Sequence, residues 1–332
     1  MNGRVSLYRL LLYIIVASIA LFSLRPDWAL QRISVSPQAV LGASLALGEL
    51  HPRKPAPAVA VFLQVANLSL WQDMWTCASS VLSANQSDVV DIYVSLTQEP
   101  TADHPQYRKL QRDLSALPAT STAFVRPVQN RGADIGQWLQ QLQMAQARRP
   151  YDLLLKMHTK SHDKWRDAAI RSLCDTPATV RTLIQRFERE PDLGMMGPQG
   201  LVWSHETPER DINLYKPSAF REQIVEVMQQ AWQLFRPERP FLARKDFFII
   251  AGSTFWMRAN ALPSTLVEAI PRLLELMPLG YLTSSNFQIA HGLERLIPSM
   301  VHARGWRIEA APRENPFSWR IRPLRPRRSA MK

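Results

Sequence analysis

The sequence predicts an α/β fold with a mostly parallel central sheet covered by helices. Between residues 59 and 158, short apolar runs of strand length alternate with longer segments of helical spacing. Strands that alternate with helices in this way pair in parallel, and the helices cover the sheet. The chain has 332 residues, 46% of them hydrophobic, which is enough to bury a large core.

Each element in the first half follows from its own pattern. The run Val59 to Val65 is apolar and bounded by Pro57 and Asn67, as is usual for a strand. Apolar residues three and four apart predict the helix that follows. The predicted strands are 59–65, 89–96, 124–128 and a strand starting at Tyr151; the predicted helices are 70–83, 107–117 and 135 to about 147.

The second half is less regular. A glycine-rich turn follows a short strand between Leu193 and Gly200, and a strand pair over 247–258 is interrupted at Gly252 and Ser253. Predicted helices cover 179–190, 218–235 and 286–297. No internal repeat is present, so we expect one α/β domain over 51–310.

The amino-terminal segment 1–50 is predicted to be a membrane anchor and linker. Leu10 to Leu24 carries no charge, but it is short for a span, which needs about twenty apolar residues. A short signal anchor, a cleaved signal peptide and an interfacial helix all fit this length. A retained anchor is favoured because no cleavage site of the Ala-x-Ala type follows, and because Trp28 lies beside Arg25, as in a membrane interface.

The carboxyl-terminal tail, 311–332, is rich in proline and arginine and contributes much of the net charge of +12. Such a tail fits anionic lipid headgroups, or it serves only solubility. Basic charge alone is a weak argument for nucleic-acid binding, and no recognised nucleic-acid motif is present. Cys77 and Cys174 are far apart and form no motif, so they do not suggest a disulfide framework, which fits a reducing compartment.

The strand from Tyr151 turns polar at its far end. By two-residue alternation Lys156, His158 and Lys160 share one face. Ligands of open α/β sheets bind beyond the carboxyl ends of strands. The sequence therefore predicts a cationic wall for a phosphate or sugar-phosphate. An ordinary strand that runs into a basic surface turn is the alternative.

The loop Asn130 to Asp134 joins a strand end to a helix start, where backbone amides and the helix dipole favour anions. Arg131 could contact a diphosphate in a bidentate way, and Gly132 would let the backbone come close. Asp134 is predicted to cap the helix. A tight turn stabilised by Asn130 and Asp134 is the simpler interpretation of this loop alone.

Two further groups are candidates for catalysis and binding. Glu294 lies on a predicted helix with His291 and Arg295 and could act as a general base. Trp256 could form an aromatic platform for a sugar ring. A surface polar cluster and a core tryptophan are the respective structural alternatives. The chain contains no P-loop, no G-x-G-x-x-G and no Asp-x-Asp pair of the kind that holds a metal against a diphosphate.

Five blocks in order, between about Val59 and Trp306, make the chain resemble the rhamnan synthesis protein F family of glycosyltransferase-like proteins. The resemblance implies a GT-A-like nucleotide-diphospho-sugar transferase fold and a role in cell-surface polysaccharide or lipopolysaccharide synthesis. The blocks are Asn130 to Gly136, Tyr151 to Lys160 with Trp165 and Arg166, Leu193 to Pro198, Ala251 to Arg258, and Ala290 to Leu296.

The resemblance implies a nucleotide-sugar donor such as dTDP-rhamnose and a lipid-linked or growing glycan acceptor. A divalent metal, Mg²⁺ or Mn²⁺, stays open as a cofactor, and lysine charge is expected to replace some or all of its work on the leaving diphosphate. A non-catalytic glycan-binding or scaffold protein of the same fold is the alternative. The implied roles are donor binding by Asn130, Arg131, Gly132, Asp134 and Lys156; catalysis by Glu294, His158 and Lys160; and acceptor binding by Trp256, His291 and Arg295.

One position departs from the family. Asn286 stands where relatives often have an aspartate, which would alter or impair catalysis if that aspartate is catalytic. Because nucleotide sugars are cytosolic, we expect a bacterial inner-membrane protein whose catalytic domain faces the cytoplasm. The anchor and the basic tail would then hold it to the membrane surface.

Overall fold

The structure is a computed structural model that describes residues 57–84, 89–97, 100–160, 162–204, 218–235, 240–243, 246–280 and 288–312. The chain divides into two compact units, Met1–Lys54 and Pro55–Lys332, and every described residue belongs to the second. The predicted anchor, Asn286 and the tail beyond residue 312 lie outside the described residues. Within the described ranges, no helix combines the length and apolar character that crossing a membrane requires.

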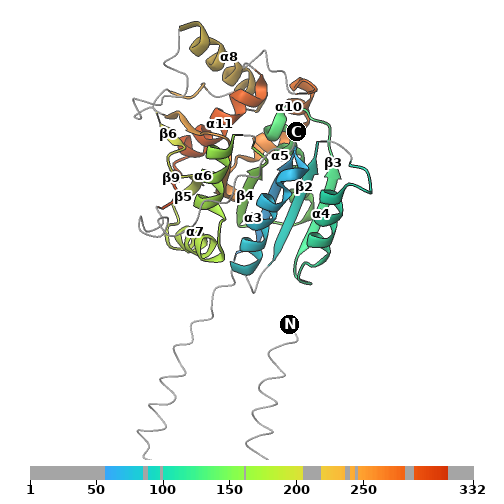
Figure 1. The fold of residues 1–332 in the computed structure, drawn as a ribbon. Helices are drawn as coiled ribbons and strands as arrows, with labels where there is room; N and C mark the ends of the chain where they lie inside the picture. Colours follow the sequence, from blue (N-terminus) through green and yellow to red (C-terminus); the bar gives the residue numbers. More distant parts are fainter. Residues whose placement is uncertain are drawn as a thin grey trace, which may run out of the picture. The chain divides into compact units, whose positions relative to one another are not determined.

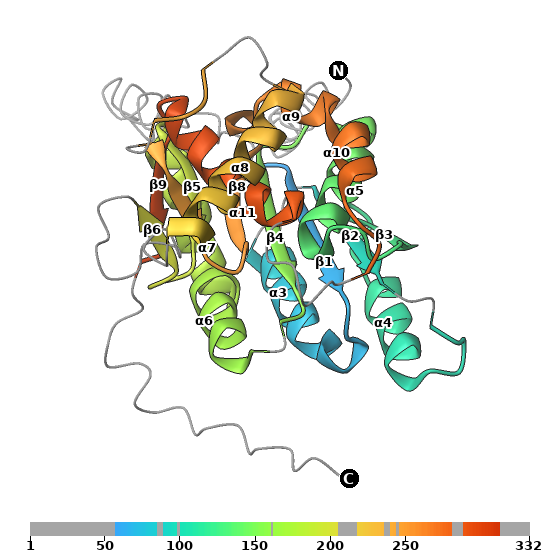
Figure 2. The ribbon, with the colours of Figure 1, turned by 90° about the horizontal axis from the view of Figure 1, so that it is seen from above.

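A seven-stranded sheet forms the centre of the second unit (Figure 1 and Figure 2). All pairings are parallel except those of β8, which runs antiparallel to both of its neighbours. The predicted α/β class with a mostly parallel sheet is therefore confirmed. In spatial order the strands are β3 (Thr122–Pro127), β2 (Val90–Leu96), β1 (Val59–Val65), β4 (Leu153–His158), β8 (Phe255–Arg258), β5 (Leu193–Gly197) and β9 (Arg307–Ala310).

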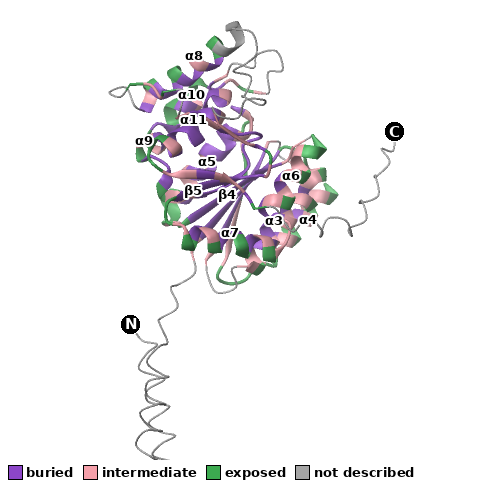
Figure 3. Ribbon diagram, turned by 90° about the vertical axis from the view of Figure 1, so that its left-hand side faces the viewer, coloured by how far each residue is buried: buried purple, intermediate pink, exposed green. Residues whose placement is uncertain are grey.

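Helices cover both faces of this sheet, as Figure 3 shows by the buried strands between them. One face packs against α3 (Trp71–Ala84), α4 (Pro105–Ser115), α6 (Asp163–Leu173) and α7 (Pro177–Arg189). The other face packs against α5 (Ala133–Arg148), α8 (Ser218–Phe235), α9 (Ser264–Glu268), α10 (Ile270–Leu276) and α11 (Ile289–Ala303). A small antiparallel sheet of β6 (Val202–Ser204) and β7 (Phe248–Ile250) completes the unit.

Strand β4 sends alternate side chains to the two faces. Leu155 and Met157 enter the core beneath α3, α6 and α7, whereas Leu154 enters the core beneath α5. Lys156 and His158 follow Leu154 at two-residue spacing and contact groups on the α5 side of the sheet. The prediction that these two polar side chains share a face is confirmed.

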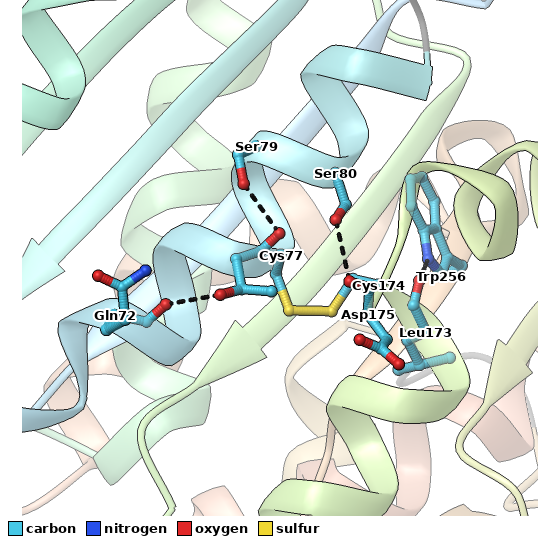
Figure 4. Close-up of a disulfide and its surroundings, with 9 residues drawn as sticks. Gln72, Cys77, Ser79, Ser80, Leu173, Cys174, Asp175 and Trp256 are labelled. Atoms are coloured by element: carbon cyan, nitrogen blue, oxygen red, sulfur yellow. Dashed lines mark hydrogen bonds between the residues drawn. A yellow bond between two sulfur atoms is a disulfide. The ribbon is translucent and has the colours of Figure 1, made fainter. Parts of the chain in front are cut away.

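Cys77 and Cys174 form a disulfide, which the spacing of the two cysteines along the sequence did not suggest. Cys77 lies in α3 and Cys174 follows the last residue of α6, and the two Cα atoms are 4.7 Å apart although 97 residues separate them in sequence (Figure 4). Spacing along the chain carried no signal here because the pairing depends on how α3 and α6 pack. Beside the disulfide, the Ser80 hydroxyl donates to the carbonyl of Asp175.

Candidate functional site

A cleft of about 400 Å³ lies where the carboxyl ends of β1 and β4 meet the amino-terminal ends of α5 and α11. The volume is in the range of small-molecule sites. Because β8 runs antiparallel, the turn before it, at Gly252 and Ser253, reaches the same edge of the sheet. The cleft is lined by Gln64, Ala66, Asn67, Leu70, Asn130, Gly132, Ala133, Asp134, Ile135, Gln137, His158, Thr159, Lys160, Ser253, Gln288, Ala290, His291 and Glu294.

A buried ion pair lies at one wall of the cleft, where Asp134 is part of the lining and Lys156 is not. The Lys156 ammonium, fully buried, lies 2.7 Å from a carboxylate oxygen of Asp134 and donates to the Ser253 carbonyl at 2.8 Å. The Ser253 hydroxyl donates to the same Asp134 oxygen at 2.5 Å. Three segments far apart in the chain, β4, α5 and the turn before β8, are therefore joined through one carboxylate.

Burial and the mutual interaction of Asp134 and Lys156 determine the charge of each side chain. Burial alone would raise the pKa of Asp134, but the positive charge of Lys156 and the hydrogen bonds from Lys156 and Ser253 hold it well below its usual range. Burial lowers the pKa of Lys156, and the Asp134 carboxylate opposes that effect. Asp134 is thus ionised and matched by Lys156, and the pair adds little net charge to the cleft.

His158 is held neutral beside this pair. Its Nε2 donates to the Gly252 carbonyl at 2.7 Å and lies 4.0 Å from Asp134. Burial lowers its pKa to about 4, despite the opposing charge of Asp134. At neutral pH the imidazole is therefore uncharged, and Lys160 supplies the positive charge at the end of β4. The Lys160 ammonium lies 5.3 Å from the centre of the Trp165 ring.

Glu294 holds the turn before β8. One carboxylate oxygen accepts a hydrogen bond from the Gly252 amide at 3.1 Å, and the other lies 3.5 Å from the Arg295 guanidinium. Gly252 and Ser253 both have positive φ, 81° and 48°, which is unusual for the serine. Contacts to Glu294, Lys156 and Asp134 hold the turn in this strained conformation.

His291 faces the same cleft one helical turn before Glu294. Burial lowers its pKa, so it too is neutral near pH 7, and its Nδ1 atom is buried without a hydrogen-bond partner among the described groups. Arg295 points away from the cleft: it is 8% exposed and donates to the His291 carbonyl at 2.8 Å. Of the predicted acceptor-binding residues, His291 alone lines the cleft.

The predicted donor loop is divided between the cleft and α10. Asn130, Gly132 and Asp134 line the cleft, whereas the Arg131 guanidinium donates to the carbonyls of Leu274 and Met277 at 3.2 and 2.7 Å. Arg131 therefore binds the last carbonyls of α10. The prediction that Asp134 caps α5 was wrong, because the cap position is Gly132 and the Asp134 carboxylate turns to Lys156.

Gly132 adopts the left-handed conformation with φ 66°, and a Cβ atom there would lie 2.1 Å from the sulfur of Met277. Position 132 requires glycine, as expected, but the reason is its close packing against Met277, the residue that follows α10. Any larger residue would be strained by this backbone conformation and would collide with the Met277 side chain.

Trp256 is a core residue, contrary to its predicted role as a sugar platform. It is fully buried on the α3 side of the sheet, and its indole donates to the Leu173 carbonyl at 2.9 Å (Figure 4). Alternation along β8 sends Trp256 and Phe255 to opposite faces. Neither ring can meet a sugar without unpacking the core.

Several cleft residues were not predicted. Gln64 and Gln137 are 1% and 2% exposed and lie at the end of β1 and in α5. Ser253 lies inside the block Ala251 to Arg258, but its contact to Asp134 joins residues 119 positions apart in the sequence. A polar residue at the end of an apolar run was the signal available for Gln64; nothing in the sequence indicated the contact of Ser253.

The question of a divalent metal was left open by the sequence. Among the residues that the structure describes, no three His, Cys, Asp or Glu side chains converge. Asp134 and Glu294 are the carboxylates in the cleft lining, and each already accepts hydrogen bonds from the protein. Mg²⁺ and Mn²⁺ prefer several oxygen ligands. The described side chains do not fit such an ion, so we derive no step through one.

Comparison with known proteins gives a match to a family model and matches to solved structures. The family model described as rhamnan synthesis protein F matches residues 55–305. Among solved structures, the chain is similar to a mannosyltransferase from Pyrobaculum calidifontis in complex with GDP-mannose and Mn²⁺, with 12% identity and a TM-score of 0.37. The match covers 85% of this chain and 66% of the archaeal one, an overlap too loose to assign a substrate. A comparison with curated proteins returns no match.

Proposed function

Because the chain belongs to the rhamnan synthesis protein F family, and so to the glycosyltransferases of polysaccharide synthesis, we propose that it moves rhamnose or a related sugar from a nucleotide-diphosphate donor to a lipid-linked or growing surface glycan. The observation that carries this proposal is the cleft, which places a cation, Lys160, and a carboxylate, Glu294, in the lining of one cavity at the ligand-binding edge of the sheet.

The donor diphosphate would lie against Lys160 and the amino-terminal end of α5. As the bond between the anomeric carbon and the diphosphate oxygen breaks, negative charge grows on the leaving group. Lys160 and the first amides of α5 stabilise that charge. Lys156 is buried and engaged by Asp134, so it acts as a positioning residue that holds the wall of the cleft and does not contact the donor.

The acceptor hydroxyl would lie against α11. Glu294 takes its proton as the hydroxyl oxygen attacks the anomeric carbon, so one carbon–oxygen bond forms as another breaks. His291 is neutral and faces the cleft, which suits a hydrogen bond to the same hydroxyl. His158 fixes the Gly252 carbonyl and thereby the turn whose amide orients Glu294.

Substitution of Glu294 and Lys160 tests these roles. Glu294→Gln keeps the acceptor for the Gly252 amide but cannot take a proton, so turnover should fall by about 10² to 10⁴. Lys160→Met should lower turnover by a factor of about 10² or more. The assay is transfer from a panel of nucleotide sugars, dTDP-rhamnose included, with denaturant unfolding to show that each variant is folded.

Lys164→Met is the matched control, because Lys164 is exposed on α6 outside the cleft lining. It should transfer sugar at the wild-type rate. Full turnover by a folded Glu294→Gln protein would show that another group takes the proton, with His291 the next to test. Full turnover by Lys160→Met would remove the cation from the mechanism.

A non-catalytic glycan-binding or scaffold role is the second candidate, favoured by Asn286 in place of a family aspartate. The two functions differ in one readout. A scaffold would bind a nucleotide sugar or a glycan without turnover, and Asn286→Asp would restore transfer if that position alone is responsible.

We also propose that the chain works at a bacterial inner membrane with the α/β unit on the cytoplasmic side, where nucleotide sugars are made. The segment 1–50 and the basic tail would supply the membrane contacts. The disulfide between Cys77 and Cys174 argues against a reducing compartment. The oxidation state of these two cysteines in cells, trapped by alkylation before lysis, therefore tests the proposed side.

A further inference from the structure

Gln64 carries a buried amide oxygen without a hydrogen-bond partner among the described groups. The side chain lies at the carboxyl end of β1, is 1% exposed and lines the cleft. An unsatisfied buried acceptor lowers the stability of the folded protein, because it has given up its hydrogen bonds to water. Such groups are rare in native proteins, and one that lies at the wall of a cleft points to a ligand that supplies the missing proton donor.

The neighbouring glutamine fixes which way this amide points. Gln141 donates through Nε2 to the carbonyls of Leu63 and Tyr93, at 3.1 and 2.9 Å. Its Oε1 must therefore accept, and Gln64 donates to it through Nε2 at 2.5 Å. Turning the Gln64 amide over would place two oxygens against each other. The free Gln64 oxygen thus follows from the hydrogen-bond network.

The side chains in register with Gln64 on the two neighbouring strands are uncharged at neutral pH. They are Ser95 on β2, whose hydroxyl donates to Gln137 on α5, and His158 on β4, whose pKa burial lowers to about 4. The β1 side of the cleft continues with Ala66, Asn67 and Leu70, whereas its titratable groups come from β4, α11 and the start of α5. A diphosphate suits the charged side. An amide oxygen repels phosphate and requires an N–H or O–H group.

We propose that Gln64 Oε1 accepts a hydrogen bond from the ring N–H of the donor nucleobase; this rests on the proposed nucleotide-sugar donor. Thymine and uracil carry that N–H at N3 and guanine carries it at N1, whereas adenine and cytosine present a lone pair at the corresponding ring nitrogen. A contact to this ring N–H favours thymine, uracil or guanine nucleotides over adenine and cytosine, whose N–H donors on the same edge are exocyclic amino groups. Gln141 is the positioning residue that turns the oxygen toward the base.

The test is the affinity of the full chain for free dTDP, UDP, GDP, ADP and CDP. Wild-type protein should bind at least one of the first three about tenfold or more tighter than ADP and CDP. Gln64→Met keeps the shape of the side chain without the oxygen and should abolish that preference. Gln140→Met is the matched control, since Gln140 lies on α5, bonds only the Gly136 carbonyl at 3.4 Å and is outside the cleft lining.

The other possible results of this test can be distinguished from one another. Wild-type affinity for ADP or CDP as high as that for the tightest of dTDP, UDP and GDP would overturn the inference without any variant. An unchanged preference in folded Gln64→Met would also overturn it and would assign the oxygen to a buried water. If Gln64→Met weakens only nucleotide sugars and not free diphosphates, the partner is a sugar hydroxyl, which overturns the base assignment. If wild-type protein binds no nucleoside diphosphate at all, the proposed function itself fails.

Discussion

The two faces of β4 show how one strand serves two purposes. Toward α3, α6 and α7, Leu153, Leu155 and Met157 are buried among apolar residues, and the Cys77–Cys174 disulfide lies in the same cluster. Toward α5, Lys156 and His158 are almost as deeply buried but contact charged and polar groups. The two faces of β4 are buried to a similar extent. They differ in the chemistry of the groups that their side chains contact.

The two faces of β4 differ in their effect on the stability of the fold: the α3 side stabilises it, and the α5 side costs stability. Apolar burial on the α3 side is favourable for every side chain it includes. On the α5 side, desolvation of Lys156, Asp134 and His158 costs free energy, and only mutual contacts offset it. Buried groups with shifted pKa values beside a cleft are typical of functional sites. The polar face is therefore where substitutions should have their largest effects.

Two near-isosteric substitutions on adjacent residues would test this contrast. Lys156→Met leaves the Asp134 carboxylate buried without its cation and should lower the free energy of unfolding by about 3–5 kcal/mol. Met157→Leu, on the other face, should cost less than about 1.5 kcal/mol. Denaturant unfolding measures both. The double variant Asp134→Asn with Lys156→Met should recover part of the stability that Lys156→Met loses. Equal losses in Lys156→Met and Met157→Leu would refute the contrast between the two faces.

The disulfide should give the next largest effect. Joining residues 97 apart restricts the unfolded chain, so Cys77→Ala with Cys174→Ala should lower the free energy of unfolding by about 2–4 kcal/mol. The loss should appear in the unfolding equilibrium while transfer per folded molecule stays unchanged, because both sulfurs lie on the face away from the cleft. A variant as stable as the wild type would mean that the apolar face does not depend on the bond.

A pH titration gives the smallest effect. The folded pKa of His158 is about 4, below the unfolded value of 6.5, so between these values the unfolded state binds a proton that the folded state does not. The free energy of unfolding should therefore fall by at most about 3 kcal/mol as the pH drops through this window. His158→Gln should flatten this part of the profile; a profile identical to that of the wild type would show that His158 is not its source.

The parts of the fold that could be predicted depend on local periodicity. The apolar run Val59–Val65 was predicted to the residue, and alternation along 153–158 placed Lys156 and His158 on one face. Strand ends pointed to the edge of the sheet where the cleft lies, since Asp134, His158, Lys160 and Glu294 all line it. Helix α6 was missed, and helix α11 was ended too early although it continues through Pro298.

The remaining features depend on contacts between distant segments. Cys77 meets Cys174 because α3 packs beside α6, and Arg131 turns to α10 because that helix ends next to the loop. Trp256 had the composition of a binding residue, but alternation from Phe255 decided which face it entered. None of these outcomes has a signature within a few residues, so sequence patterns could name the candidates without assigning their partners.

The reversed strand β8 has a genetic consequence. Because it brings the main chain of Gly252 and Ser253 to the cleft, Lys156 and His158 are held by carbonyl oxygens. A point mutation can replace the Ser253 hydroxyl, but it cannot delete a carbonyl. These two anchors are therefore encoded by the path of the chain and can outlast changes in the side chains around them.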